Sequence, residues 1–398
     1  MPDKNEIRSL KQLFEKELFE NIVPFWQTNS PDREHGGYYN CLSRDGTVYD
    51  TTKYVWLQGR QVWMFSKLYN QHEAKPEWLD IAKLGINFLQ NHTVRDDRRL
   101  YFSLNEKGKP TWIQRKIFSE CFYIIALAEY SRAADEPDLM KEAEEQFEFV
   151  WNWSKDLSQL GRPVLEGQVP SRSLAVPMIL LNVIKELTGG NTSGYEQEIE
   201  DCIKQILLHV HEDKKTVFET VGVEGQFLDT IEGRLLNPGH AIEAGWFLHQ
   251  WAAILNNDGL QQTTINIIRW SHECGWDQKH GGLFYFLDYK GHSPTQLEWF
   301  MKLWWPHNEA MIAHLLNYTV TGEQKDWRLF KQVQDYSFSH FHDDEHGGWF
   351  GYLNREGNVT HSFKGGPYKG FFHVPRSLWI CYKLLEKLED DTSNPPRV

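Results

Sequence analysis

A thirteen-residue pattern occurs three times in the chain and constrains the fold more than any other feature. Its copies are EHGGYYNCLSRDG at 34–46, KHGGLFYFLDYKG at 279–291 and EHGGWFGYLNREG at 345–357. After the two glycines, apolar and polar residues alternate until a further glycine ends the run. Such alternation followed by a turn residue predicts a short strand that enters a tight turn.

Looser copies extend the pattern along the chain. LYFSLNEKG at 100–108 and VFETVGVEG at 217–225 have the same spacing between the first apolar residue and the last glycine. The gap between them predicts a degenerate copy near residue 160, for which GRPVLEGQVP at 161–170 is the candidate. With a step of roughly sixty residues, the chain contains six repeated units.

The stretches between the strand–turn units have helical periodicity. IFSECFYIIALAEYSRAA at 117–134 and GHAIEAGWFLHQWAAIL at 239–255 are two examples, and each gap is long enough for two helices. We therefore predict an all-α fold, a closed (α/α)6 barrel of six helix pairs with short β-hairpins at one end. An open solenoid is the alternative, but the sequence has no evident end caps. We expect one domain over residues 1–390 and a disordered tail over 391–398.

Composition excludes several classes of function. The formal net charge of −13 and a pI of about 5.7 disfavour nucleic acid, which prefers a basic surface. The five scattered cysteines indicate reduced thiols rather than a disulfide framework. Neither a signal peptide nor an apolar run of membrane-spanning length is evident, so we expect a soluble cytoplasmic protein without a membrane partner.

Common cofactor motifs are missing from the sequence. We find no G-x-G-x-x-G after a strand, no phosphate-binding P-loop and no G-x-S-x-G elbow. The run HFHDDEHGG at 340–348 is rich in metal-ligating residue types, but it adjoins a predicted turn, and we interpret it as a solvated loop. We therefore expect neither a metal nor a bound cofactor.

The repeat also predicts where polar side chains gather. Each of four residues lies about 22–24 positions after the start of a strand, near a predicted helix start: Arg60, His240, His307 and His373. Several of these stretches carry a proline, which favours the first turn of a helix: Pro177, Pro238, Pro306 and Pro375. Glu120 occupies the corresponding stretch of the second unit. In a closed ring, equivalent positions converge on one mouth of the barrel.

Neighbouring residues suit a binding site. Glu243 follows His240 by three positions, and Arg376 follows His373 by three, so each pair shares a helix face. Trp305 precedes His307, and Glu309 follows it.

A lone histidine at a helix start more often caps or packs, and we interpret His35, His280 and His346 of the repeated pattern as structural. Repetition favours function for the others. We interpret His240 and His373 as catalytic, His307 as a supporting or substrate-binding residue, and Met178 as an apolar wall.

Two facing histidines, a guanidinium and carboxylates suit proton transfer at a carbon next to a carbonyl. Because histidine titrates near neutral pH, one imidazole can take the proton while another returns one. An arginine can stabilise the charge that develops on the enediolate oxygen.

At these residues the chain resembles the N-acylglucosamine 2-epimerase family, also known as renin-binding proteins. The resemblance rests on WLQGRQVW (56–63), LAVPMIL (174–180), EGRLLNPGHAIEAGWF (232–247) and KGGPYKGFFHVPR (364–376), and it extends over essentially the whole chain. It implies an (α/α)6 barrel and the reversible conversion of N-acetyl-D-glucosamine to N-acetyl-D-mannosamine, an amino-sugar substrate.

The resemblance also implies residue roles. His240 and His373 would be the two acid/base groups, Arg60 and Glu309 would bind or polarise the sugar, and Glu243 would orient the neighbouring imidazole. Cellobiose epimerases of the same fold carry a histidine where this chain has Met178, which favours the N-acyl sugar. For some family members, ATP is an activator that is not consumed, and homodimers are common.

Three other functions remain open from the sequence. A cellobiose 2-epimerase or a mannose-type isomerase would use the same barrel. A glycoside hydrolase or polysaccharide lyase would need opposed carboxylates, for which Glu243 and Glu309 are candidates. A non-catalytic binding protein is the third alternative.

Overall fold

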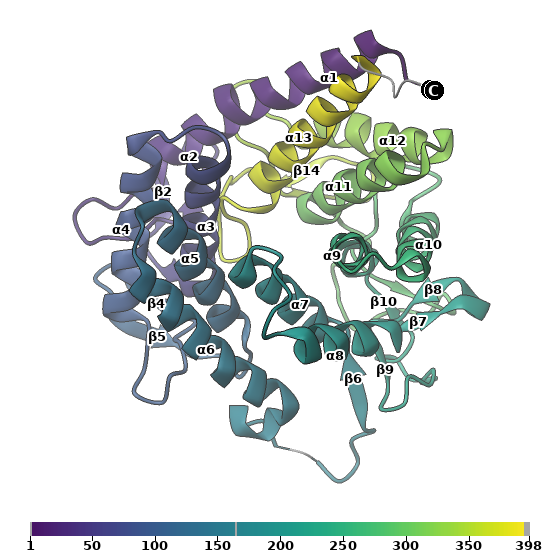
Figure 1. The fold of residues 1–398 in the computed structure, drawn as a ribbon, viewed down its shortest axis with the longest axis horizontal. Coiled ribbons are helices and arrows are strands. Elements are labelled where there is room, and N and C mark those ends of the chain that lie inside the picture. Colours follow the sequence, from purple (N-terminus) through teal and green to yellow (C-terminus); the bar gives the residue numbers. More distant parts are fainter. Residues whose placement is uncertain (1, 164, 394–398) are drawn as a thin grey trace.

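The structure is a computed structural model that describes residues 2–163 and 165–393. Figure 1 shows inner helices arranged around a common centre. They are α3 (Val55–Gln71), α5 (Phe118–Ala134), α7 (Ala175–Thr188), α9 (Pro238–Ile254), α11 (Trp304–Thr321) and α13 (His373–Ser393). In α5, α9 and α11 most residues are buried, because these helices are apolar on nearly every face.

Outer helices cover this ring, and each packs against the inner helix of its own unit. They are α4 (Pro76–His92), α6 (Pro137–Lys155), α8 (Glu196–Leu207), α10 (Asp258–Gly275) and α12 (Gln324–His340). They bury one apolar stripe and expose a charged face, as amphipathic surface helices do. Short 3-10 helices span Leu157–Leu160 and Glu212–Lys214.

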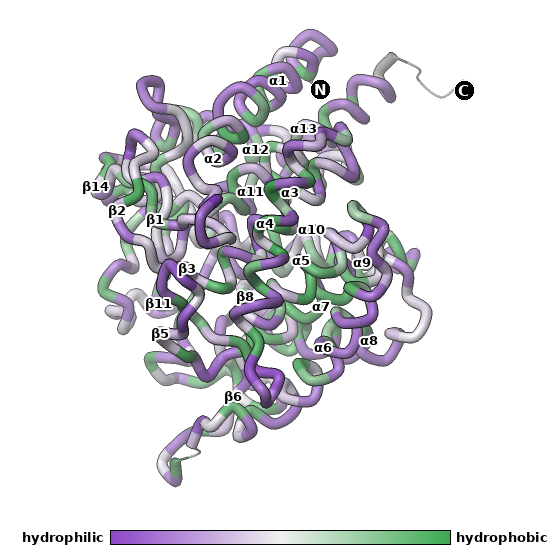
Figure 2. The backbone as a smooth tube through the Cα atoms, turned by 90° about the vertical axis from the view of Figure 1, so that its left-hand side faces the viewer, coloured by the Kyte–Doolittle hydropathy of each residue, from purple (hydrophilic) through white to green (hydrophobic). Residues whose placement is uncertain are grey.

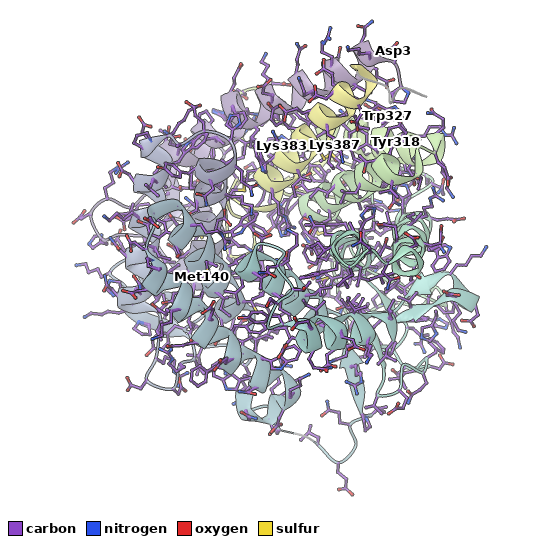
Figure 3. All side chains as sticks on the ribbon, viewed as in Figure 1. Asp3, Met140, Tyr318, Trp327, Lys383 and Lys387 are labelled. Carbon is purple, nitrogen blue, oxygen red and sulfur yellow. The ribbon has the colours of Figure 1, made fainter. Side chains whose placement is uncertain are left out.

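The N-terminal segment supplies the outer partner of the last inner helix. It consists of α1 (Lys4–Lys16), a π-helix (Glu17–Ile22) and α2 (Val23–Asn29), and α1 packs against α13. Figure 1 shows these two ends of the chain side by side. Trp327 of α12, labelled with Tyr318 near Asp3 in Figure 3, donates a hydrogen bond to Glu6 of α1 at 3.3 Å. The ring is therefore closed, and the expected (α/α)6 barrel is confirmed.

Short strands lie on one side of the barrel, as Figure 2 shows for β1, β2, β3, β5, β11 and β14. Their bounds are β1 (Cys41–Leu42), β2 (Val48–Asp50), β3 (Lys53–Tyr54), β4 (Ser103–Leu104), β5 (Pro110–Trp112), β6 (Ser171–Ser173), β7 (Val210–His211), β8 (Thr216–Val217), β9 (Thr220–Gly222), β10 (Leu235–Leu236), β11 (Leu287–Asp288), β12 (Lys302–Leu303), β13 (Tyr352–Leu353) and β14 (Val359–His361). The glycines that end the repeated pattern all have positive φ: Gly46, Gly108, Gly225, Gly291 and Gly357. This is the turn conformation that the pattern predicts.

Strand pairing links each unit to the next. The strand before an inner helix pairs with a strand of the following unit in β3–β4, β6–β9, β10–β11 and β12–β13. At the junction of the last and first units, the Lys364 amide donates to the Leu42 carbonyl at 2.9 Å. The layer of hairpins thus forms a closed ring, as the helices do.

A buried ion pair fixes each full copy of the histidine–glycine pattern. An aspartate three residues before the histidine accepts a hydrogen bond from a buried lysine, in Asp32–Lys53, Asp277–Lys302 and Asp343–Lys364. The same lysine Nζ also donates to a glycine carbonyl of the pattern. The pattern therefore anchors the backbone that leads into the next inner helix.

Two expectations differ from the described structure. Residues 161–163 and 165–170 contain no strand, so the predicted degenerate copy is wrong there, and the nearby strand β6 pairs with β9 of the next unit. Helix α13 includes residues 391–393 of the expected disordered tail, and residues 394–398 lie outside the described residues. Among the described helices, none combines the length and apolarity needed to span a membrane.

Candidate active site

A cavity of about 550 Å³ opens between the N-termini of the inner helices and the strands beside them. Its lining residues are Trp56, Arg60, His240, Glu243, Tyr285, Glu298, Met301, Leu303, Trp304, Trp305, Tyr352, His361, Tyr368 and His373. Five of the residues predicted from the sequence are among them: Arg60, His240, Glu243, Trp305 and His373. An apolar cavity with a few converging charged groups is typical of small-molecule sites.

Local capping places His240 at the cavity. Asn237 is the N-cap of α9, and its side chain accepts a hydrogen bond from the His240 amide at 3.1 Å. Pro238 begins the helix, as the sequence predicts. At Gly239 an added Cβ would lie 2.6 Å from the Trp305 ring, so only glycine permits this close approach. His240 and Trp305 are consequently neighbours.

The partner of His240 is Glu219, in the segment between β8 and β9. His240 Nδ1 and Glu219 Oε2 lie 3.0 Å apart. Burial lowers the pKa of His240, but the charge and hydrogen bond of Glu219 outweigh burial, so its net pKa is raised. This arrangement favours the imidazolium form of His240.

His373, the first residue of α13, has different surroundings. Its Nδ1 lies 2.7 Å from Oε1 of Glu309, and the same oxygen accepts from Arg376 at 2.6 Å. Arg376 also donates to Glu243 at 2.8 Å. Burial lowers the pKa of His373 well below the ordinary value, and the charges of Arg60 and Arg376 lower it further. His373 is therefore a neutral imidazole, and with Nδ1 donating to the carboxylate its Nε2 is the free basic nitrogen.

Trp305 contacts both histidines. Its ring centroid is 5.3 Å from that of His240 and 5.9 Å from that of His373. Trp246 donates to the second oxygen of Glu309 at 2.9 Å, which fixes the carboxylate beneath the cavity. A sugar held against the indole would thus be within reach of both imidazoles.

The sequence expectation for Glu243 differs from this geometry. Three residues after His240 on the same helix, Glu243 was expected to orient that imidazole, but it accepts from Arg376 of α13 instead. Helical spacing brings His240 and Glu243 to one face, but it does not determine which donor Glu243 binds. The guanidinium of Arg376 is a stronger donor to a carboxylate than the imidazole is. Glu219 takes the orienting position.

His307 does not line the cavity. It is fully buried, its Nε2 accepts from the Leu283 amide at 2.9 Å, and its Nδ1 donates to the Leu303 carbonyl at 2.6 Å. Burial lowers the pKa of His307 to about 3. It is the fourth residue of α11, and Gln58, the fourth residue of α3, accepts from the Tyr38 amide at 2.8 Å in the same way. Instead of the expected site role, His307 supports the backbone at Leu283 and Leu303.

Glu120 and Met178 also lie outside the cavity lining. Glu120 is buried and accepts from Arg99 at 2.7 Å and from the Leu100 amide at 3.0 Å. Burial is the main reason that its pKa is raised. Met178 is buried in the main hydrophobic core, so it forms no wall of this cavity.

Sequence reasoning missed Glu219 and the aromatic residues at the mouth, Tyr285, Tyr352, His361 and Tyr368. The alternation in VFETVG gives no usable signal for Glu219. Strict alternation would place Glu219 and Val221 on one face, but Val221 packs in the same buried cluster as Phe218. The irregular backbone between β8 and β9 therefore hides the direction of Glu219 from the sequence pattern.

Among the described residues, two groups bring ligand atoms close enough for a metal, Asp32–His35–Glu106 and Glu243–Glu309–His373, and in each a protein cation already binds a carboxylate. Glu243, Glu309 and His373 have ligand atoms within 4.8 Å of one another, but both glutamates accept from Arg376. In the run at 340–348, Asp343 is bound by Arg44 and Lys364, and His342 lies 3.1 Å from Glu17. We predicted a solvated loop for that run. The structure differs at one residue, because Asp343 is buried and forms ion pairs.

Known proteins share both sequence and fold with this chain. The profile of the family described as N-acylglucosamine 2-epimerase (GlcNAc 2-epimerase) matches residues 37–377. The N-acylglucosamine 2-epimerase of Bos taurus is 45% identical, over 97% of this chain and 93% of that protein. That of Homo sapiens is 44% identical, over 97% of this chain and 92% of that protein. The solved structure of cellobiose 2-epimerase from Bacillus thermoamylovorans superposes with a TM-score of 0.81 at 22% identity, covering 96% of this chain and 100% of that one.

Proposed function

The chain belongs to the N-acylglucosamine 2-epimerase family, and from this premise we propose that it is a sugar 2-epimerase that interconverts N-acetyl-D-glucosamine and N-acetyl-D-mannosamine. The two sugars differ only in the configuration at C2. The reaction therefore needs a proton to leave one face of C2 and another to arrive on the opposite face. The open-chain aldehyde is the reacting form, because its carbonyl acidifies the C2–H bond.

One observation carries the proposal: two histidines that line one cavity and contact the same Trp305 ring prefer different charge states, one cationic and one neutral. The neutral His373 has a free Nε2 that can take the C2 proton. The electron pair of the broken C–H bond then forms the C1–C2 double bond of a planar enolate, with the negative charge on the C1 oxygen and the acetamido group still on C2. His240, with its raised pKa, holds a proton that it can give to the other face. In the reverse direction the two imidazoles exchange roles.

Arg60 supplies the charge that the intermediate needs. Its guanidinium lines the cavity, and burial lowers its pKa to about 9, so it stays positive at neutral pH. A fixed cation that faces the developing C1 oxyanion stabilises the enolate more than the neutral aldehyde. This difference between transition state and ground state lowers the barrier.

The carboxylates have positioning roles in this mechanism. Glu219 holds His240 through Nδ1 and Glu309 holds His373 through Nδ1, so that both Nε2 atoms remain available for the sugar. Arg376 holds Glu309 and Glu243 together beneath the cavity. Neither side of the reaction requires a cofactor, because both proton carriers and the cation belong to the chain.

The glycoside hydrolase alternative has less support. Hydrolysis uses two carboxylates about 5–9.5 Å apart on either side of the bond that breaks. Glu243 and Glu309 instead share one guanidinium, Arg376, and have ligand atoms within 4.8 Å of one another. Cellobiose epimerisation and mannose isomerisation remain the alternatives on the same barrel.

A heavy-water assay tests the proposal. The protein is incubated in D₂O with N-acetylmannosamine, N-acetylglucosamine, cellobiose and mannose, with and without ATP, and deuterium at C2 is followed by NMR. We expect deuterium in both N-acetyl sugars and their interconversion. Turnover confined to cellobiose or mannose would overturn the choice of substrate, and release of reducing ends from an oligosaccharide would favour a hydrolase.

Three further features belong to the proposal as predictions, the first two from the family and the third from the sequence. ATP would raise the exchange rate without being consumed, which the paired assays measure directly. A homodimer is checked by light scattering coupled to gel filtration. A cytoplasmic location is checked by fractionating cells that express the protein.

A further inference from the structure

Among the cations at the cavity, Arg60 is unusual because the described residues offer it no hydrogen bond or ion pair. Its guanidinium lies among three aromatic rings instead, 4.1 Å from the Phe122 centroid, 4.9 Å from Trp56 and 5.0 Å from Phe372. The Arg60 Nε atom is buried and has no hydrogen-bond partner among the residues that the structure describes. A buried donor of this kind costs free energy unless a ligand satisfies it.

The other positive groups at the site are already neutralised. Arg376 donates to both Glu243 and Glu309, and His240 is paired with Glu219. Each of these cations is therefore matched by at least one carboxylate oxygen within 3.0 Å. Of the described cations at this site, Arg60 is therefore the one whose charge is left for a ligand.

A second buried donor lines the same cavity. Trp304 Nε1 is buried without a hydrogen-bond partner among the described residues, and Trp304 belongs to the cavity lining together with Arg60. A guanidinium fork and an indole N–H are both donors only, so they favour a ligand with several acceptor oxygens. A planar, delocalised anion fits the fork better than a hydroxyl group does.

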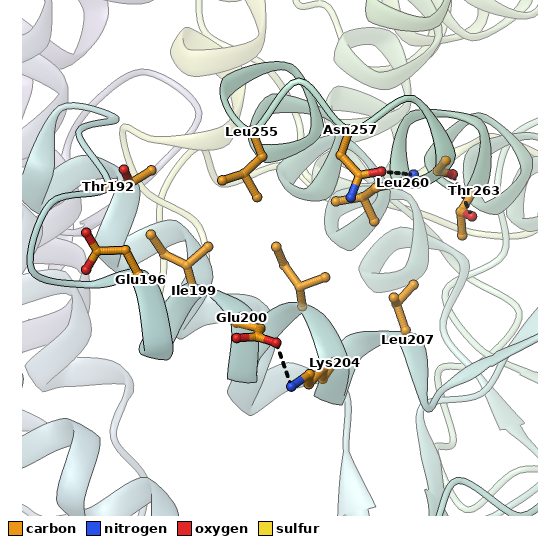
Figure 4. A pocket seen from close by; sticks show the side chains of 12 residues that line it. Thr192, Glu196, Ile199, Glu200, Lys204, Leu207, Leu255, Asn257, Leu260 and Thr263 are labelled. Carbon is orange, nitrogen blue, oxygen red and sulfur yellow. Dashed lines mark hydrogen bonds and ion pairs between the residues drawn. The ribbon is translucent and has the colours of Figure 1, made fainter.

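The larger cavity elsewhere in the molecule has no such feature. It has a volume of about 630 Å³ and lies between α8 and the start of α10, and Figure 4 shows its side chains. Its polar groups satisfy one another: Lys204 pairs with Glu200 at 2.7 Å, and Asn257 caps α10. Glu196 and Thr263 bond to backbone groups of Gly194 and Gly259, and most of the remaining lining side chains are apolar, so nothing there calls for an anion.

We infer that the catalytic cavity binds open-chain sugar acids, 2-acetamido-2-deoxyaldonates, with the C1 carboxylate on Arg60. This inference rests on the proposed function, because it places C1 of the sugar where the enolate oxygen would form. In an aldonate, C1 is planar and bears a delocalised negative charge, as in the intermediate, while the remaining hydroxyl groups match the open-chain substrate. Such acids would be competitive inhibitors of the epimerase.

The test compares two ligands that differ at C1 alone. Binding of 2-acetamido-2-deoxygluconate and of the neutral alditol, 2-acetamido-2-deoxyglucitol, is measured by isothermal titration calorimetry on the full chain. We expect the acid to bind at least about tenfold more tightly than the alditol, because a charge-assisted contact replaces a neutral one. Equal affinities would overturn the inference.

Variants assign the preference to Arg60. In Arg60→Gln we expect the ratio of the two affinities to fall to about one, and in Arg60→Lys, which keeps the charge but not the fork, to an intermediate value. Lys116→Gln is the matched control: it removes an exposed cation close enough to influence His240 and should leave the ratio within about twofold. A ratio that survives in Arg60→Gln would contradict the assignment. If that variant does not fold, an unchanged ratio in Arg60→Lys would do the same.

Deuterium exchange run in parallel separates this inference from the proposed function. If N-acetylmannosamine exchanges at C2 while acid and alditol bind equally, the sugar-acid inference alone is wrong. If no sugar exchanges, the proposed function fails, and an acid preference lost in Arg60→Gln still establishes the anion site.

Discussion

His240 and His373 present the same imidazole to one cavity, but their neighbours favour the cationic form of the first and the neutral form of the second. His240 is paired with Glu219 at 3.0 Å, and its pKa is raised in spite of burial. His373 is paired with Glu309 at 2.7 Å, yet burial and nearby arginines lower its pKa. A carboxylate partner alone therefore does not decide the charge of a histidine.

The difference lies in what else binds the carboxylate. Arg376 donates to the Glu309 oxygen that faces His373, so the carboxylate is already compensated. The Glu219 carboxylate can favour the imidazolium form of His240 because a protonated imidazole is its ionic partner. The same fold thus holds one acid and one base at rest, which is what inversion at a single carbon requires. Four predictions test this comparison.

The largest effect is expected from removing either imidazole. His240→Asn and His373→Asn should each slow epimerisation by about a thousandfold or more, since each removes a proton carrier for one face. Deuterium exchange at C2 should nevertheless persist in one epimer only, and in the opposite epimer for the two variants. NMR of each purified sugar in D₂O measures this. If both variants exchange the same epimer, the histidines do not serve opposite faces.

Removing the guanidinium beneath His373 should make the two histidines more alike. Arg376→Met leaves two buried carboxylates, Glu243 and Glu309, without their cation, which costs about 3–5 kcal/mol of stability in urea unfolding. It should also raise the pKa of His373. Because the neutral form is the base and exists above that pKa, the acid limb of the pH–rate profile should move to higher pH. Arg376→Lys, which keeps a charge, is the control, and an unmoved acid limb in the methionine variant would contradict the account.

Removing the charge beside His240 should act on the other limb. Glu219→Gln keeps a hydrogen-bonding group but lowers the pKa of His240, whose protonated form exists below that pKa. The alkaline limb should therefore move to lower pH, by about one unit. Glu224→Gln, an exposed glutamate in the turn after β9, is the matched control and should leave the profile in place. A stability loss without any shift of the limb would mean that Glu219 is only structural.

The repeat explains how much of this could be predicted from sequence. Strand–turn units at a regular step have one simple closed arrangement, a ring. The repeat therefore predicted the barrel, and counting residues from each strand predicted that Arg60, His240 and His373 lie at one mouth of it. The pairing of α1 with α13 has no counterpart in the repeat, because α1 precedes the first strand–turn unit. Closure by that helix depends on tertiary packing, which no local pattern encodes.

Counting was less reliable for single side chains. Arg60 is the sixth residue of α3, His307 the fourth of α11 and His373 the first of α13, so similar distances from the strand do not give equivalent positions. One residue along a helix turns a side chain by about 100°, enough to move it from cavity to core. The sequence also does not show which carboxylate pairs with His240. Glu243 would be a candidate, but it accepts a hydrogen bond from Arg376, and Glu219 pairs with His240 instead.

His307 offers the smallest and cleanest test, because it is a third histidine whose partners are backbone groups. Its pKa of about 3 keeps it neutral, and it does not touch the cavity. His307→Gln should cost about 1 kcal/mol, since glutamine fills the same role at Gln58, whereas His307→Ala leaves the Leu283 amide unpaired and should cost about 2–3 kcal/mol with the added cavity. Both values come from urea unfolding. In the glutamine variant, turnover per folded molecule and both limbs of the pH–rate profile should match the parent protein. A shift of either limb of the pH–rate profile would mean that His307 takes part in catalysis. Hydrogen bonds to backbone groups would then not be enough to keep a histidine out of the reaction.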